Sequence, residues 1–600
     1  MKRYLLLGIL AGFVVVVSIV AVLALLFHAA PADSAAASTH SDQGVALMRQ
    51  HLYHAAIEEF EAATRQAPEA LDPWVGLAAV YIRLGNGPKA LEGAGKAVGI
   101  AEDSADVQLV FGRAQWLARN FSDAEKAALK AEKLQPSSPH AAELLLSIYF
   151  DRNDDARFHE VLDRLENPNR AVQDLAIQFA IRRGEFRRAY ELWNSFERGT
   201  LSADVLRAEL ALNREPGRTE LYLPLVRNLI RLGRADEAIA AANAYGAKVP
   251  LDLEMGRALW LNGKSEAAVR AYQRASDAKT HRMSAEVALA VITDDSRHWA
   301  EAFRAEWFEK DYFVLAQLEP LLKDSSPLQK ALIYRYAGLY DGELFNDAAR
   351  EARSALEVDP DNFEALMTLG TAYARIGRVD DAIRYIQQAA DRLPDRAEVL
   401  SRLGQFALQK GDLDAAETSL AKAVRMEPSN ASYLYNYGWL LDKSDRKREA
   451  VPYYERAIAE SSLSFEAMNN LALIEATSGR ADRALLLLSR AVASNSENET
   501  AYFNRGNYYA ELRSWSNALA DYARARALNP LNALAFVESA RVHMELDRVD
   551  IALEELGAAL EIDPRVPEGY VLLSAAYTKQ GKEMEAAAAL KESKRIEERR

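Results

Sequence analysis

Hydrophobic residues follow two different patterns along this chain of 600 residues. Residues 5–27 are apolar and uncharged, and a helix of that length would extend for about 35 Å, enough to cross the ~30 Å hydrocarbon layer of a membrane. From residue 43 onward, apolar and polar residues instead recur with the period of amphipathic helices, which are separated by short polar turns. The two patterns predict one membrane-spanning helix followed by an all-α region.

The charges beside the apolar segment predict its orientation. Lys2 and Arg3 precede the segment, and the next basic residue is Arg49. Because positively charged flanks stay in the cytoplasm, we expect residues 1–4 to be cytoplasmic, residues 5–27 to form an uncleaved signal-anchor helix, and the rest to lie across the membrane. Residues 28–42 are rich in Ala and Ser and are expected to form a tether. Cleavage after the apolar segment remains an alternative, because small residues follow it.

Small residues and prolines recur every 34 residues in the C-terminal part of the chain. One position of the period holds Gly370, Gly404, Gly438, Ala472, Gly506, Ala540 and Ser574. A second position, twelve residues further on, holds Ala382, Ala416, Ala450, Ala484, Ala518, Ala552 and Ala586. Asn362, Asn430, Asn498 and Asn532 precede the first helix of their repeats, where they are expected to act as N-caps. Such a repeat cannot bury its apolar face alone, so the repeats are expected to stack into a solenoid.

The small residue and two alanines at offsets 8, 20 and 27 of the period, with a proline at offset 32, resemble the tetratricopeptide repeat (TPR). The resemblance implies an all-α TPR solenoid superhelix of about fourteen helix–turn–helix pairs. It is strongest over 363–600. The expected C-terminal array covers 329–600 and includes a weaker repeat at 329–362, in which Tyr336 stands at the small-residue position. A second array is expected over 43–138. Between the two arrays, residues 139–328 are expected to form a degenerate repeat-like region, in which Gly256, Ala268 and Ala275 mark one regular repeat.

Charge and composition narrow the function. The net charge of −14 argues against a nucleic-acid partner, and the absence of cysteine excludes disulfides, cysteine nucleophiles and thiolate metal sites. Residues 93–97 lack the first glycine of a phosphate-binding loop. His51, His54 and Glu58 lack the order of a zinc-binding helix. We therefore expect a non-enzymatic protein without cofactor or metal.

Three asparagines are the strongest candidates for a binding site. Asn436, Asn470 and Asn504 each stand two residues before the small position, which turns them about 200° away from the tight helix contact and towards the concave groove. Side-chain amides there can hold the backbone of an extended peptide, and the series is similar to the asparagine ladder in the TPR arm of O-linked N-acetylglucosamine transferases. A solvated polar groove is the alternative. Further wall residues are expected at Arg375, Trp439, Lys443 and Asn507.

The aromatic segment 295–313 allows two interpretations. Trp299, Phe303 and Trp307 form one stripe on a helix, which suits either a core helix between the two arrays or an exposed partner-binding patch.

The chain as a whole resembles bacterial inner-membrane proteins with a periplasmic TPR array. That resemblance implies a scaffold or adaptor that binds a protein or peptide partner, in envelope assembly, secretion or polysaccharide export. The alternative is a regulatory or carbohydrate-handling subunit of a polysaccharide synthase, export or glycosyltransferase complex. Association with a second copy is left open.

Overall fold

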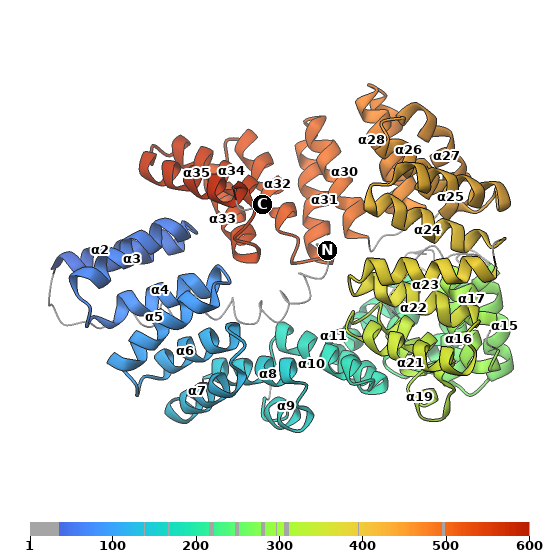
Figure 1. The fold of residues 1–600 in the computed structure, drawn as a ribbon, viewed down its shortest axis with the longest axis horizontal. Coiled ribbons are helices and arrows are strands. Elements are labelled where there is room, and N and C mark those ends of the chain that lie inside the picture. Colours follow the sequence, from blue (N-terminus) through green and yellow to red (C-terminus); the bar gives the residue numbers. More distant parts are fainter. Residues whose placement is uncertain are drawn as a thin grey trace. The chain divides into compact units, whose positions relative to one another are not determined.

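The computed structural model describes residues 35–136, 138–165, 168–214, 221–245, 251–277, 282–295, 297–304, 311–393, 395–461, 464–494 and 498–598. The elements in these ranges are helices and no strand occurs among them (Figure 1), which confirms the expected all-α class. The apolar segment 5–27 lies outside the described residues. None of the helices that are described is both long enough and apolar enough to cross a membrane.

The chain divides into two compact units, which we call the terminal unit (residues up to 175 together with 496–600) and the central unit (residues 176–495). The terminal unit contains α2 (Ala35–Arg49), α3 (Tyr53–Gln66), α4 (Leu71–Arg83), α5 (Gly87–Ile100), α6 (Ala105–Leu117), α7 (Phe121–Leu134), α8 (Pro139–Arg152), α9 (Asp155–Leu162), α30 (Glu499–Glu511), α31 (Trp515–Leu528), α32 (Ala533–Glu545), α33 (Val549–Ile562), α34 (Pro567–Lys579) and α35 (Glu583–Glu597). Helix α10 (Arg170–Arg182) runs across the boundary. Helix α2 includes residues 35–42, which the sequence analysis assigns to the tether.

The central unit begins with less regular helices and continues with repeats. Its first part contains α11 (Phe186–Arg214), α12 (Tyr222–Arg231), α13 (Ala235–Tyr245), α14 (Asp252–Leu261), α15 (Ser265–Asp277), α16 (Arg282–Thr293), α17 (Arg297–Arg304), α18 (Tyr312–Ala316) and α19 (Leu321–Asp324). Its second part contains α20 (Pro327–Ala337), α21 (Leu344–Val358), α22 (Phe363–Arg375), α23 (Val379–Arg392), α24 (Ala397–Lys410), α25 (Leu413–Met426), α26 (Ala431–Lys443), α27 (Lys447–Glu460), α28 (Phe465–Thr477) and α29 (Ala481–Ser494).

Side-chain caps begin several first helices at the expected places. The side chains of Asn362, Asn430, Asn498 and Asn532 each accept a hydrogen bond from the backbone N–H three residues further on. Because these N–H groups have no partner inside the helix, each asparagine fixes where its helix starts. The start of the helix in turn determines which residues of the following turns face the groove.

A second repeated contact explains the small position of each repeat. A Cβ atom on Gly438 would lie 3.0 Å from the ring of Tyr454, the residue sixteen positions later. The same register pairs Gly506 with Tyr522, where the distance would be 2.8 Å. A side chain at either of these glycines would therefore collide with the tyrosine of the second helix. The register predicted from the sequence is confirmed by this contact.

The regular repeat predicted inside the degenerate region has the same contact. A Cβ atom on Gly256 in α14 would lie 2.8 Å from the ring of Tyr272 in α15. In the repeat at 329–362 the two sizes are exchanged, because Tyr336 occupies the small position and the residue sixteen positions later is the fully buried Ala352. Helices α14–α15 and α20–α21 thus pair like the regular repeats.

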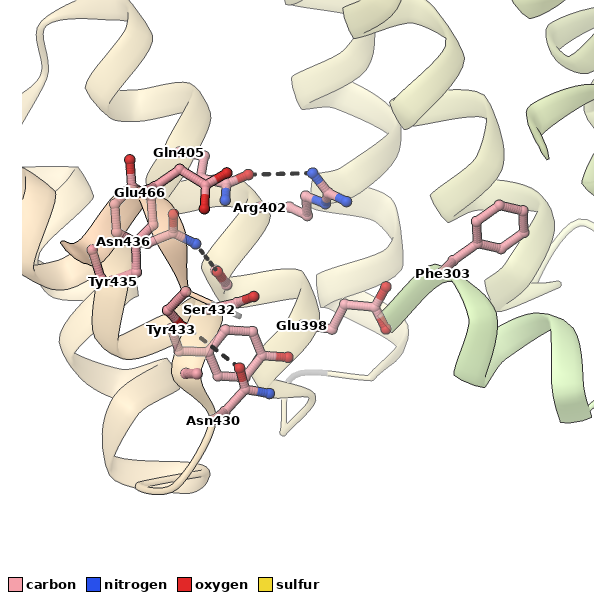
Figure 2. A pocket seen from close by; sticks show the side chains of 14 residues that line it. Phe303, Glu398, Arg402, Gln405, Asn430, Ser432, Tyr433, Tyr435, Asn436 and Glu466 are labelled. Atoms are coloured by element: carbon pink, nitrogen blue, oxygen red, sulfur yellow. Dashed lines mark hydrogen bonds between the residues drawn. The ribbon is translucent and has the colours of Figure 1, made fainter. Parts of the chain in front are cut away.

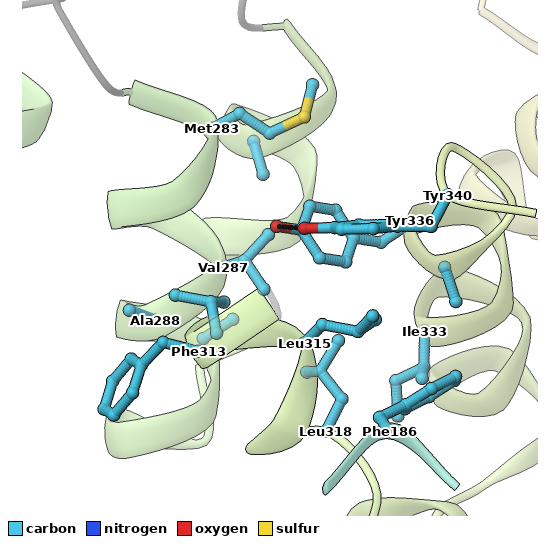
Figure 3. Close-up of a cluster of buried hydrophobic side chains, with 14 of the residues drawn as sticks. Phe186, Met283, Val287, Ala288, Phe313, Leu315, Leu318, Ile333, Tyr336 and Tyr340 are labelled. Atoms are coloured by element: carbon cyan, nitrogen blue, oxygen red, sulfur yellow. Dashed lines mark hydrogen bonds between the residues drawn. The ribbon is translucent and has the colours of Figure 1, made fainter. Parts of the chain in front are cut away.

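The apolar core of the first half of the central unit joins several helices that lack the repeat signature (Figure 3). Phe186 from α11, Met283 and Val287 from α16, and Leu315 from α18 share this core with Tyr336. The hydroxyl of Tyr336 lies 3.0 Å from that of Tyr340. In this region the helices are therefore held together by one shared apolar core and not by the repeated contact between paired helices.

A buried network of charges lies beside this core. Glu254 on α14 is 0% exposed, and its Oε1 accepts a hydrogen bond of 2.9 Å from Nε of Arg227 on α12. Arg257 reaches the same carboxylate oxygen at 3.6 Å and also pairs with Asp311, the N-cap of α18. Because buried charges are costly without partners, the network fixes α12, α14 and the start of α18 against one another. This network was not predicted from the sequence.

Candidate functional site: a polar cavity on three successive repeats

A cavity of about 260 Å³ lies in the central unit, on the first helices of three successive repeats (Figure 2). It is lined by residues of α24, by the start of α26, by the start of α28 and by one side chain from α17. The lining residues are Phe303, Glu398, Ser401, Arg402, Gln405, Asn430, Ala431, Ser432, Tyr433, Tyr435, Asn436, Ser464, Glu466 and Ala467.

Asn436, one of the three predicted asparagines, belongs to this cavity. The cap of Asn430 on the N–H of Tyr433, at 3.2 Å, starts α26 and thereby directs Asn436 to the cavity. Asn436 is 7% exposed, and its Nδ2 donates a hydrogen bond of 3.3 Å to Oγ of Ser401 on the preceding repeat. The amide retains a second N–H and its carbonyl oxygen, which is the donor and acceptor set that a peptide group requires.

One arginine, Arg402, contributes to the lining of the cavity. Nη1 of Arg402 donates to Oε1 of Gln405 at 3.3 Å. Burial, followed by the neighbouring charge of Arg375, lowers the pKa of Arg402, while Glu398 opposes this shift. The lining thus contains both signs of charge, since Glu398 and Glu466 contribute carboxylates.

Phe303 reaches the cavity because α17 packs close to α20. Its ring centre lies 3.9 Å from the guanidinium of Arg335, which is 3% exposed and donates to Thr368 at 3.4 Å. Burial and the nearby Arg402 lower the pKa of Arg335 to about 10. The ring therefore covers a buried cation on one face.

Asn470 lies beside the cavity and is held by Tyr454. Its Nδ2 donates to the hydroxyl of Tyr454 at 3.3 Å, and the ring centre of Tyr454 lies 6.0 Å from that of Tyr435. Burial and the nearby Glu466 raise the pKa of Tyr435 to about 12. The structure thus places Asn436 in the cavity wall, whereas Asn470 bonds to Tyr454 on the second helix of the preceding repeat.

The other two candidate asparagines belong to α30 of the terminal unit. Asn504 is half-buried. Oδ1 of Asn507 accepts a hydrogen bond of 2.9 Å from the hydroxyl of Tyr522 on α31. Asn507 therefore contacts the second helix of its own repeat. Within the central unit, the predicted series is represented by Asn436 and Asn470.

The remaining candidates lie outside the lining of this cavity. Trp439 is half-buried on α26, and Lys443 is exposed at the end of the same helix. Arg375 is exposed at the end of α22, where its guanidinium lies 5.7 Å from the ring centre of Phe345.

Three further lining residues were not predicted, although the 34-residue period of the sequence relates them. Glu398, Ser432 and Glu466 are spaced by 34 residues, and they precede Arg402, Asn436 and Asn470 by four residues each. The cavity is therefore lined by equivalent positions of successive repeats, and the residue type at these positions differs from one repeat to the next.

The described part of the aromatic segment 295–313 contributes to the apolar core and, through Phe303, to the cavity. Trp299 is buried in the apolar core and stacks on Phe303, with ring centres 6.0 Å apart. Phe313 is buried in the same core. Trp307 and Phe308 lie outside the described residues.

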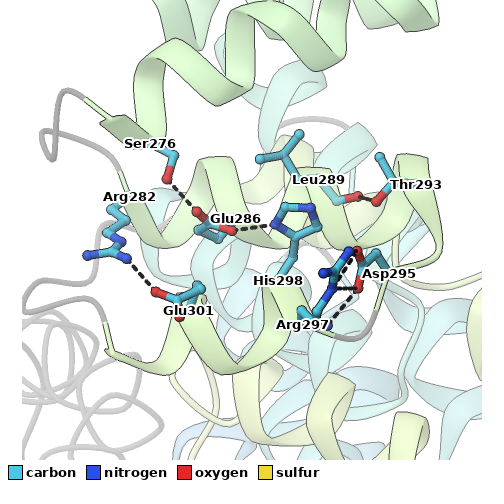
Figure 4. Close-up of polar contacts among 9 residues, drawn as sticks. All are labelled: Ser276, Arg282, Glu286, Leu289, Thr293, Asp295, Arg297, His298 and Glu301. Carbon is cyan, nitrogen blue, oxygen red and sulfur yellow. Dashed lines mark hydrogen bonds and ion pairs between the residues drawn. The ribbon is translucent and has the colours of Figure 1, made fainter.

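Three residues of the central unit bring together the types found in hydrolases (Figure 4). Ser276 donates its hydroxyl proton to Glu286, and Nδ1 of His298 lies 2.7 Å from the other oxygen of the same carboxylate. Because the carboxylate separates the serine from the histidine, the imidazole cannot accept the serine proton in this arrangement. The three residues form a structural polar contact between α15, α16 and α17.

Comparison with known proteins identifies the repeat. Tetratricopeptide repeat profiles match residues 41–105, 109–173, 338–397, 377–436, 435–499, 469–533 and 503–567, which together cover more than half of the chain. The match at 109–173 extends past residue 138, where the sequence analysis ends the N-terminal array. No curated protein matches the chain.

Several solved structures are similar to parts or most of the chain. Cut9–Hcn1 of the APC/C is 13% identical, covers 89% of this chain and 95% of its own, and has a TM-score of 0.38. YrrB, a TPR protein with an unusual peptide-binding site, is 21% identical over 31% of this chain and 96% of its own, with a TM-score of 0.25. The type IV pilus biogenesis factor PilW is 20% identical over 34% of this chain and 96% of its own, with a TM-score of 0.32. These scores are low, so the family assignment comes from the repeat profiles.

Proposed function

Because the chain belongs to the tetratricopeptide repeat family, we propose that it is a scaffold that binds an extended segment of a protein partner at the polar cavity of the central unit. The side chain of Asn436 carries this proposal. It is held by Ser401 through one N–H and keeps a donor and an acceptor for a peptide group. A side chain that is already fixed loses little conformational entropy when it binds a partner.

The lining favours a peptide over a carbohydrate. Sugar sites need open aromatic faces, whereas the ring of Phe303 is covered by Arg335 and the ring of Tyr435 packs against that of Tyr454. The exposed Glu466 and the mixed charges of Glu398 and Arg402 suit polar side chains of an extended segment. A carbohydrate-handling subunit is thus the second candidate.

Selection of peptides tests the proposed site. We expect a displayed peptide library to yield binders to the full chain, and Asn436→Ala to weaken them about five- to tenfold, the equivalent of one hydrogen bond. Asn507→Ala is the matched control, because Asn507 faces Tyr522 and should leave affinity unchanged. The measurement is fluorescence anisotropy, with melting curves to verify that both variants fold. Equal affinities for wild type and Asn436→Ala would contradict the site, and selective binding of oligosaccharides would favour the second candidate.

We further propose that residues 5–27 anchor the protein in the inner membrane and that the repeats act without catalysis in the periplasm, in envelope assembly, secretion or polysaccharide export. The uncharged apolar run and the basic residues before it support this location. In a bacterial host, the full chain should resist alkaline extraction from membranes, whereas a chain lacking residues 1–34 should be released. Protease added to spheroplasts should digest the repeats. Protection of the repeats until the cells are lysed would contradict the orientation.

A further inference from the structure

The first and the last repeat contact each other inside the terminal unit. Helix α3 packs against α35, although the two helices lie at opposite ends of the described chain. Leu52, the residue before α3, is fully buried in the apolar cluster of the last repeats together with Leu556 and Tyr570. Leu47 and Ala55 border the same cluster. The apolar end of the array is therefore covered by residues from the start of the chain.

Polar groups define how the two repeats meet. The Oε1 atom of Glu592 on α35 accepts the backbone N–H of His54 at 2.5 Å, and its Oε2 lies 2.5 Å from Nδ1 of the same histidine. Glu592 is 2% exposed. At the rim, Oε1 of Glu58 lies 2.8 Å from Nζ of Lys591 and 3.0 Å from Nη2 of Arg595. One buried hydrogen-bonded carboxylate and a rim of opposite charges make the two surfaces complementary.

Helix α33 supplies the space for this contact. A Cβ atom on Gly557 would lie 3.1 Å from Nε2 of His51. A glycine in the middle of a helix is destabilising relative to alanine, and the close approach of His51 explains why a glycine stands here. Shape, charge and hydrogen bonding thus all match across the contact.

We propose that the surface formed by α33 and α35 is a binding surface whose ligand is the first repeat of the same chain. Solenoid arrays leave an apolar surface at each end, which must be capped for the protein to stay soluble. Here Leu52 and His54 take the place of a separate capping helix on the last repeat. The two ends of the array thereby stabilise each other.

Hydrogen exchange at a single amide tests this contact. His54 is the second residue of α3, and an amide in the first turn has no acceptor within its own helix. Protection of this amide therefore depends on Glu592. In the full chain we expect the His54 amide to exchange at least tenfold more slowly than an open helix start, and this protection to be lost in Glu592→Ala. Fast exchange of this amide in the wild type would overturn the proposal.

Cross-linking decides whether the contact forms within one chain. The natural chain has no cysteine, so a short bis-maleimide reacts only with Glu58→Cys and Lys591→Cys in the double variant. We expect a cross-linked product with the mass of one chain. No product, or a product that joins two chains, would overturn the proposal.

Two glycine substitutions separate packing from folding in the same assay. Added to the cysteine pair, Gly557→Leu should lower the cross-linking yield several-fold, because the side chain would fill the space of His51. Gly95→Leu is the control, since a Cβ atom there meets nothing within 4 Å. Both changes favour helix formation, so the helical content should be retained. An undiminished yield in Gly557→Leu would show that packing on α33 does not hold the contact.

Discussion

The guanidinium of Arg335 lies 3.9 Å from the ring centre of Phe303 and joins a helix without repeat signature to the first helices of the C-terminal array. Arg335 is buried and is close to a second, half-buried arginine, Arg402. An aromatic face partly compensates for the lost hydration of such a cation. Phe303 therefore connects the irregular part of the central unit to the cavity that the repeats form.

Replacing Phe303 tests this connection. Phe303→Leu should destabilise the central unit by about 1–3 kcal/mol, because a desolvated cation–π contact contributes about 2 kcal/mol and the smaller side chain fills less space. Urea unfolding followed by circular dichroism gives the free energy of unfolding. Phe303→Tyr keeps the aromatic face. Its free energy of unfolding should therefore stay within about 1 kcal/mol of the wild-type value, as is usual for conservative core changes. Equal losses in both variants would show that the cation is not stabilised by the ring.

Two glycine-to-alanine changes should have opposite effects on stability. In Gly506→Ala, the new Cβ atom would lie 2.8 Å from the Tyr522 ring, so we expect a loss of about 1–3 kcal/mol. In Gly95→Ala, in the middle of α5, the Cβ atom meets nothing within 4 Å, so we expect a gain of about 0.5–1 kcal/mol. Thermal unfolding of both variants measures the difference. A gain in both would mean that the small position of the repeat tolerates a side chain.

His51 should make stability depend on pH between about 4 and 6.5. Burial, followed by the charge of Arg83, lowers the pKa of His51 from 6.5 to about 4, so the folded protein keeps this imidazole neutral in that range. The unfolded chain then binds more protons, and stability falls as the pH drops from 6.5 towards 4, by at most about 2–3 kcal/mol.

A variant isolates the contribution of His51 from that of other groups. His51 has a φ of 61°, and asparagine tolerates this left-handed conformation, so His51→Asn should fold without added strain. The difference between the two curves of unfolding free energy against pH should be flat above pH 6.5, because the imidazole is neutral in both states there. Below that pH the wild type should lose stability relative to His51→Asn. Parallel curves from pH 7 to 4 would show that the pKa of His51 is not lowered in the folded protein.

Removing the centre of the buried charge network should be strongly destabilising. Glu254→Leu leaves Arg227 and Arg257 without this carboxylate, and breaking a buried pair in this way costs about 3–5 kcal/mol. Asp204→Asn weakens an exposed pair with Arg207 on α11 and should cost less than about 1 kcal/mol. Urea unfolding compares the two variants. A loss below 1 kcal/mol in Glu254→Leu would mean that the network adds nothing beyond packing, since an exposed pair contributes about that much.

The sequence was sufficient where one contact recurs from repeat to repeat. The glycine at 438 and the tyrosine at 454 belong to one helix pair, and the same spacing returns at Gly506 and Tyr522. A contact between neighbouring helices is repeated by the 34-residue period, so the all-α class, the repeat register and the asparagine caps could all be predicted. Asn436 was found for the same reason, since its helix position follows directly from that register.

Contacts that occur only once were decided by the tertiary structure. The ring of Phe303 over Arg335 and the network around Glu254 join helices whose order in the sequence carries no period. His54 and Glu592 are 538 residues apart, and no local pattern relates them. A periodic sequence determines how each helix packs on the next, because those interactions are local and repeated. Which distant surfaces meet depends on the curvature that accumulates over many repeats, and this curvature arises only when the helices are packed together.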